Sequence, residues 1–135
     1  MSTQTQNGYM LLFRGTDWYK GLSSEEIQRV MDQWMGWFNR LSEQGKAVAG
    51  SPLEPSGKIV AAKSGRVTVA DGPFAESKEA IGGYFLLNVS TFEEAVAIAE
   101  QCPGLPYGAI IEVRAVAAEC PVAKQLREEA QLAAV

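Results

Sequence analysis

Two short segments of the chain, residues 9–13 and 84–89, are apolar at consecutive positions, with Asn88 as the one polar break. Side chains alternate between the two faces of a β-sheet, so a strand built from such a segment is apolar on both faces. Both segments are therefore expected at the centre of a sheet whose two faces are covered. This requirement restricts the fold more than any other feature of the sequence.

Two helices are expected to cover one face of this sheet. Ser23 and Glu26 form a capping-box pattern ahead of a segment with helical apolar spacing, which predicts a helix to about residue 43. Thr91 and Glu94 predict a second helix in the same way. Gly36 lies inside the first helix, which suggests the close approach of another element. The apolar stripe of the first helix is expected in the core and consists of Ile27, Val30, Met31, Trp34, Phe38 and Leu41.

The remaining segments complete the order of elements. Residues 46–49 are expected to form a short strand, and the runs 58–63 and 66–70 are separated by two turn-forming residues, which predicts a hairpin. Apolar and charged residues alternate in the expected last strand, 109–116, and residues 122–132 are expected to form a weak alanine-rich helix. The order indicates an α+β fold: a ferredoxin-like antiparallel sheet with two helices on one face and an inserted hairpin.

Two helices cover only one face of such a sheet, so the other face of the central strands would remain apolar. Monomeric proteins rarely expose apolar patches larger than a few hundred Å². We therefore expect a homodimer in which two sheets face each other. The alternative cover is the segment 122–132, folded over the sheet of its own chain.

The length of 135 residues and the hydrophobic content of 47% fit one domain. We expect a flexible tail at 1–7, a domain at 8–120 and a C-terminal helical extension at 121–135. The 16 acidic and 12 basic residues give a net charge of −4 and form no basic block, so nucleic acid is not expected as a partner. No apolar run approaches the length of a signal sequence or a membrane span, so we expect no membrane association and a cytoplasmic location.

The sequence contains no histidine. This excludes, within one chain, catalytic schemes that need a histidine base and metal sites that need imidazole ligands. Cys102 and Cys120 lie far apart, without the spacing of a redox pair or a zinc site, and both are expected to be buried free thiols. We therefore expect no transition metal and no cofactor.

The tetrapeptide Asp-Gly-Pro-Phe at residues 71–74 is followed by a glycine pair at 82–83 and an apolar run. Glycine and a proline of fixed φ favour a tight, rigid turn, which holds Asp71 at a fixed point. This stretch resembles the signature of the YCII-related family, DGPF-domain branch. The resemblance spans about residues 8–116 and implies the ferredoxin-like fold and its pairing as a dimeric α+β barrel. The His-Asp pair proposed for that family has no counterpart in a chain without histidine.

Asp71 is the first candidate for a catalytic group, because a carboxylate at the mouth of a sheet can act as a general base. Asp71 can equally cap the following segment or accept hydrogen bonds from its own turn. Arg14, Glu112 and Arg114 can equally form a salt-bridge ladder. Phe74 can close a ligand pocket beside Asp71, but we expect a lone aromatic after proline to anchor the core instead. The candidate ligand-binding residues are Arg14, Phe74, Lys78, Tyr84, Glu112 and Arg114, and the further candidate carboxylates are Glu76 and Glu79.

Three functions fit these residues. The first is a dimeric small-molecule-binding protein, or a lyase-like or isomerase-like enzyme, with a pocket near Asp71. The second is a non-catalytic interaction or regulatory module, because the resemblance to DGPF proteins implies a link to extracytoplasmic-function sigma factors. The third is a structural dimer without a ligand. Trp18 and Tyr19 lie in a loop, where they either form a lid over a pocket or pack against an edge.

Overall fold

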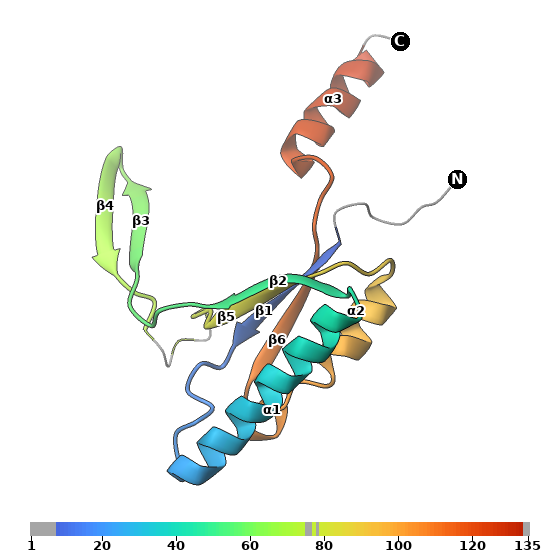
Figure 1. Cartoon of the computed structure of the whole chain (residues 1–135). Coiled ribbons are helices and arrows are strands. Elements are labelled where there is room, and N and C mark those ends of the chain that lie inside the picture. Colours follow the sequence, from blue (N-terminus) through green and yellow to red (C-terminus); the bar gives the residue numbers. More distant parts are fainter. Residues whose placement is uncertain (1–7, 75–76, 78, 134–135) are drawn as a thin grey trace.

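The computed structural model describes residues 8–74, 77 and 79–133, so the expected tail at 1–7 lies outside the described residues. The chain has an α+β fold, in which a four-stranded antiparallel sheet carries two helices on one face and a two-stranded sheet projects away (Figure 1). This confirms the expected class. The elements in chain order are β1 (Tyr9–Arg14), α1 (Ser24–Glu43), β2 (Ala47–Pro52), β3 (Lys58–Lys63), β4 (Arg66–Asp71), β5 (Gly83–Leu87), α2 (Phe92–Ala99), the 3-10 helix η1 (Leu105–Tyr107), β6 (Ile110–Ala115) and α3 (Pro121–Ala133).

The strand order of the large sheet is β2-β5-β1-β6, so the two doubly apolar strands lie at its centre, as expected. On β1, Leu11 and Phe13 are buried beneath the helices. The ring of Phe13 meets that of Phe85 edge-on, with centroids 4.8 Å apart. The expected strand at 46–49 is longer than the sequence indicated, because β2 continues to Pro52 along β5.

The opposite face of the sheet carries no described helix. Residues that pair directly across antiparallel strands lie on the same face, and Leu12 stands opposite both Tyr84 and Glu112. We call this surface the open face. Its residues on the three strands β1, β5 and β6 are Met10, Leu12, Arg14, Tyr84, Leu86, Ile110, Glu112 and Arg114.

Helix α1 begins as the sequence predicts. The amide of Glu26 donates to Oγ of Ser23 at 3.1 Å, and the amide of Ser23 donates to Oε1 of Glu26 at 2.9 Å, which completes the capping box. The expectation of a close neighbour at Gly36 is wrong, because a Cβ there would meet only the Nη1 atom of Arg40, at 3.4 Å. No described helix is long and apolar enough to cross a membrane.

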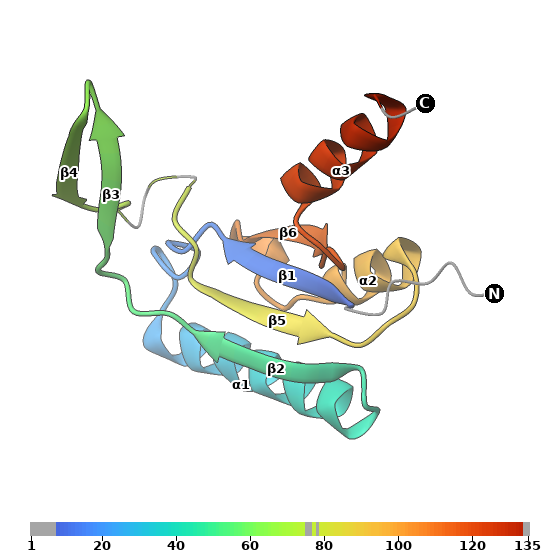
Figure 2. The ribbon, with the colours of Figure 1, turned by 90° about the horizontal axis from the view of Figure 1, so that it is seen from above.

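Two parts of the chain project from the compact body (Figures 1 and 2). The β3–β4 hairpin is exposed along its whole length, and α3 has no buried side chain. Both extend from the side of the sheet opposite to α1 and α2 (Figure 1). Segment 122–132 therefore does not cover the sheet of its own chain, which removes the alternative cover that the sequence left open.

Candidate functional site

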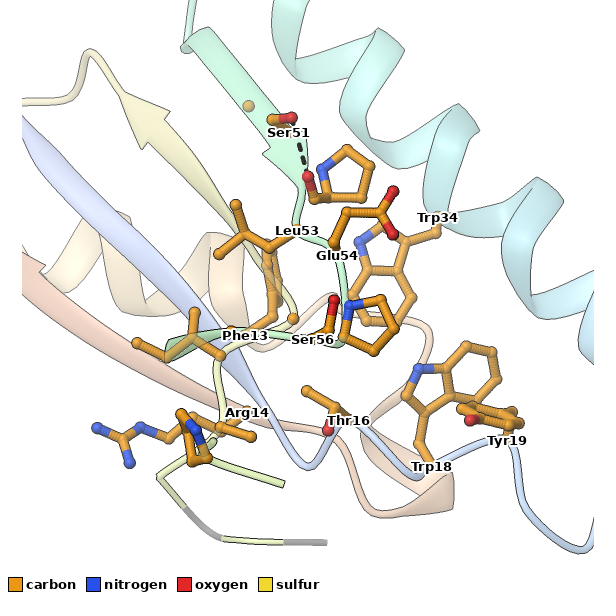
Figure 3. Close-up of a pocket in the computed structure, with 18 of the residues that line it drawn as sticks. Phe13, Arg14, Thr16, Trp18, Tyr19, Trp34, Ser51, Leu53, Glu54 and Ser56 are labelled. Carbon is orange, nitrogen blue, oxygen red and sulfur yellow. Dashed lines mark hydrogen bonds between the residues drawn. The ribbon is translucent and has the colours of Figure 1, made fainter. Parts of the chain in front are cut away.

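An open cleft of about 970 Å³ lies at the end of the sheet where β1 and β2 finish. Its walls come from the loop after β1, from α1, from the segment that leads into the hairpin, and from the segment that returns to β5 (Figure 3). The return segment is tied to the entry segment because the amide of Gly72 donates to the carbonyl of Gly57 at 3.0 Å. The hairpin therefore joins the body at the rim of this cleft.

The wall formed by α1 and the first loop is aromatic. The half-buried rings of Trp18 and Trp34 stack with centroids 5.9 Å apart and an interplanar angle of 30°. Tyr19 meets Trp18 edge-on at 6.0 Å. Met31 and Met35 are exposed on the same wall, where their flexible thioether side chains can adapt to different ligand shapes.

The expectation that the whole stripe of α1 lies in the core is therefore wrong in part. Val30 and Leu41 are buried as expected, but Met31 is exposed and lines the cleft together with Trp34 and Phe38. Trp37 was not included in the predicted stripe, but it is fully buried in the core. A sequence signal for the cleft was present, because Met31, Trp34, Met35 and Phe38 form a second stripe at helical spacing beside the core stripe.

The charged side chains that line the cleft among the described residues are Arg14, Glu54, Lys58 and Glu79. Both cations are paired with a carboxylate. Nη2 of Arg14 lies 2.6 Å from Oε1 of Glu112, and Lys58 pairs with Asp71 across the hairpin.

Asp71 ends β4 at the base of the hairpin, and its side chain is exposed. It does not line the large cleft. It borders an adjoining hollow of about 610 Å³ together with Lys58 and Phe74. Lys58 lines both cavities, so the ion pair of Asp71 connects the two. Phe74 is 64% exposed, so the expectation that it anchors the core is wrong.

Arg14, Glu112 and Arg114 meet on the open face, where Nη1 of Arg114 lies 3.0 Å from Oε2 of Glu112. Hydrogen bonds from Arg114 and then from Arg14 lower the pKa of Glu112. Tyr84 shares this face, with Leu12 between it and Glu112. The structure therefore separates the candidate residues into a group on the open face and a group, Asp71 and Phe74, beside the hairpin.

Lys78 and Glu76 lie outside the described residues. Glu79 is described and lines the cleft. Among the described residues, no group of three or more histidine, cysteine or acidic side chains could hold a metal ion. The expected absence of a metal and of a cofactor stays a prediction. Cys102 is buried as expected, whereas Cys120 is exposed, which corrects the expectation for that thiol.

Comparison with known proteins identifies the family. The family model described as "YCII-related domain" matches residues 9–119, which include the cleft and the hairpin. An uncharacterized protein of Rhizobium meliloti (strain 1021) is 33% identical over 79 residues, a match that covers 57% of this chain. The matched region spans 64% of that relative's own length. The chain belongs to the family of proteins with a YCII-related domain.

Proposed function

We propose that this protein binds a small molecule in the cleft between α1 and the base of the hairpin. The observation that carries the proposal is the cleft itself, about 970 Å³ in volume and walled largely by aromatic, methionine and proline side chains. Ligand sites of proteins are typically concave, mostly apolar and about 300–1,000 Å³ in size. A few polar groups, among them Ser56 and Thr16, are available to orient a ligand.

The proposal concerns binding and assigns no reaction. Asp71 contributes to the proposed site indirectly. Its ion pair with Lys58 restrains the lysine side chain at the junction of the cleft and the smaller hollow. A role for Asp71 as a general base would be an additional proposal, because it requires a ligand that extends from the cleft into the smaller hollow. Cytoplasmic location and a link to extracytoplasmic-function sigma factors stay predictions from the sequence.

A thermal-shift screen with a library of small molecules tests the proposal. Ligands that bind the cleft raise the melting temperature by mass action. Met35 is 61% exposed and lines the cleft, so Met35→Glu should leave the fold intact and abolish these shifts. Gln33→Glu is the matched control, since Gln33 is exposed on the same helix and does not line the cleft. Shifts that survive Met35→Glu, or a library without any hit, would contradict the proposal.

We also propose that a second copy of the chain covers the open face. Met10, Leu12 and Leu86 make the centre of this face apolar, and no described helix of the same chain lies over it. Removing apolar area from water is worth about 25 cal/mol per Å², which favours pairing of two such faces. A face-to-face pair with two-fold symmetry would form the dimeric α+β barrel that the family resemblance implies.

The two projecting elements support this assembly. Val60, Val67 and Val69 lie on one face of the hairpin and are 64–73% exposed, although an isolated two-stranded hairpin is at best marginally stable in water. The hairpin and α3 flank the open face, so both can contact a second copy that packs against this face (Figure 1).

Sedimentation measures this assembly directly. Wild-type protein is expected to sediment as a dimer, and Val60→Lys is expected to weaken the dimer at least about tenfold, because it places a charge in the valine face. Ala61→Lys is the matched control on the opposite face of the same strand and should leave the dimer intact. A wild-type protein that stays monomeric on concentration would overturn the proposal, and equal effects of the two substitutions would exclude the hairpin from the interface.

A further inference from the structure

The charged side chains that line the described part of the cleft differ in whether they have an ion-pair partner. Arg14 is paired with Glu112, which it shares with Arg114, and Lys58 is paired with Asp71. Glu54 and Glu79 line the same cleft, and within residues 8–74, 77 and 79–133 neither has an ion-pair partner. The described part of the cleft therefore presents uncompensated negative charge to whatever enters it.

This negative charge adjoins the aromatic wall. Glu54 belongs to the segment that leads into the hairpin, and its side chain extends toward Trp34 in Figure 3. The stacked pair of Trp18 and Trp34 exposes indole surface to the cleft. The face of an aromatic ring carries partial negative charge, and tryptophan attracts cations more strongly than the other aromatic residues do.

We infer that the ligand of the cleft is a cation: an organic ammonium ion, alkylated or quaternary, attached to an apolar body. The inference deepens the proposed small-molecule binding and rests on it. In this arrangement the ammonium group lies between the carboxylate of Glu54 and the indole rings, while the apolar body contacts Met31, Met35 and Phe38. An anionic ligand would instead have to displace one of the two existing ion pairs before it met a free cation of the described cleft.

Three probes of similar shape and different charge test the inference. Benzyltrimethylammonium is the cation, neopentylbenzene is its uncharged carbon analogue, and benzylsulfonate carries a negative charge on a tetrahedral head group. Each is titrated into the intact protein while tryptophan fluorescence is recorded. The cation should bind about tenfold more tightly than the uncharged analogue, and the sulfonate should bind more weakly than both.

Two substitutions then assign the preference to one carboxylate. Glu54→Gln should reduce the affinity for the cation about three- to tenfold and leave the affinity for neopentylbenzene unchanged. Glu100→Gln makes the same change of net charge at an exposed position outside the cleft and should have no effect on either probe.

The outcomes separate this inference from the proposed function. If neopentylbenzene binds as tightly as the cation, or benzylsulfonate binds best, the ligand class is refuted while a small-molecule site remains. Equal effects of Glu54→Gln and Glu100→Gln would refute the assignment to Glu54. If no probe binds, the cationic class is refuted, and the library screen with Met35→Glu decides separately whether the cleft is a binding site.

Discussion

Replacement of Gly104 by alanine is expected to destabilise the protein and to disturb the aromatic wall of the cleft. Gly104 is buried between α2 and η1, with a φ of −85° that any residue can adopt, so backbone strain is not the reason for glycine here. A Cβ atom would lie 2.6 Å from Cζ3 of Trp34 and 3.0 Å from Cβ of Ala109. Overpacking of this kind typically costs about 1–3 kcal/mol, because neighbouring side chains must leave their preferred rotamers.

The matched control is the same substitution where space is available. Gly36 lies in the middle of α1, where a Cβ would meet only the Nη1 atom of Arg40, at 3.4 Å. Alanine is favoured over glycine in a helix interior by about 1 kcal/mol. Gly36→Ala is therefore expected to raise the free energy of unfolding by about 0.5–1 kcal/mol, opposite in sign to Gly104→Ala.

Urea unfolding measures both changes, and near-ultraviolet circular dichroism reports on the stacked indoles of Trp18 and Trp34. Gly104→Ala should lower the urea midpoint and change this spectrum, and Gly36→Ala should raise the midpoint without changing the spectrum. In a Trp34→Leu background the cost of Gly104→Ala should shrink, since the clashing ring is gone. A Gly104→Ala variant with the wild-type midpoint and spectrum would refute the packing argument.

Three further outcomes are expected. Burial raises the pKa of Cys102 to about 11, and backbone amides lower the pKa of exposed Cys120, so only Cys120 should react rapidly with a disulfide reagent at neutral pH. The pKa of Glu112 is lowered in the folded protein, so its contribution to stability should be present above its unfolded pKa and lost as the pH falls through the folded pKa; Glu112→Gln should remove that part of the acid dependence of the urea midpoint. Asp71→Asn should change stability by less than about 1 kcal/mol, because its pair with Lys58 is exposed, and a loss of several kcal/mol in urea unfolding would contradict this.

The elements that the sequence predicted well depend on local or strictly periodic signals. The start of α1 follows from the capping box of Ser23 and Glu26, whose atoms belong to a single turn of helix. The central position of β1 and β5 follows from the apolar runs 9–13 and 84–87, which place apolar side chains on both faces of the sheet. The inserted hairpin follows from the Ser64-Gly65 turn, in which both residues have positive φ.

One wall of the cleft left a signal in the sequence, the stripe of Met31, Trp34, Met35 and Phe38, but the cleft itself could not be predicted, because its other walls come from segments that are distant in the sequence. Helical spacing placed Trp34 on an apolar stripe but could not decide whether the ring faced the core or a cavity beside it. The same limit applies to Asp71. The rigid turn was recognised, but its position depends on how far the hairpin projects from the body, which no local pattern determines.

The hairpin connects the two proposals, and this connection can be measured. Its base contributes Lys58, Gly72 and Pro73 to the wall of the cleft, while its outer part carries the exposed valine face that a second copy is proposed to cover. A partner that fixes the hairpin also fixes that wall, so binding of the ligand and pairing of the chains should strengthen each other by the same factor. A ligand from the screen should therefore lower the dimer dissociation constant in sedimentation, and Val60→Lys should weaken ligand binding although Val60 does not line the cleft. Equal ligand affinity in Val60→Lys and Ala61→Lys, with only the former monomeric, would show that the cleft is complete within one chain.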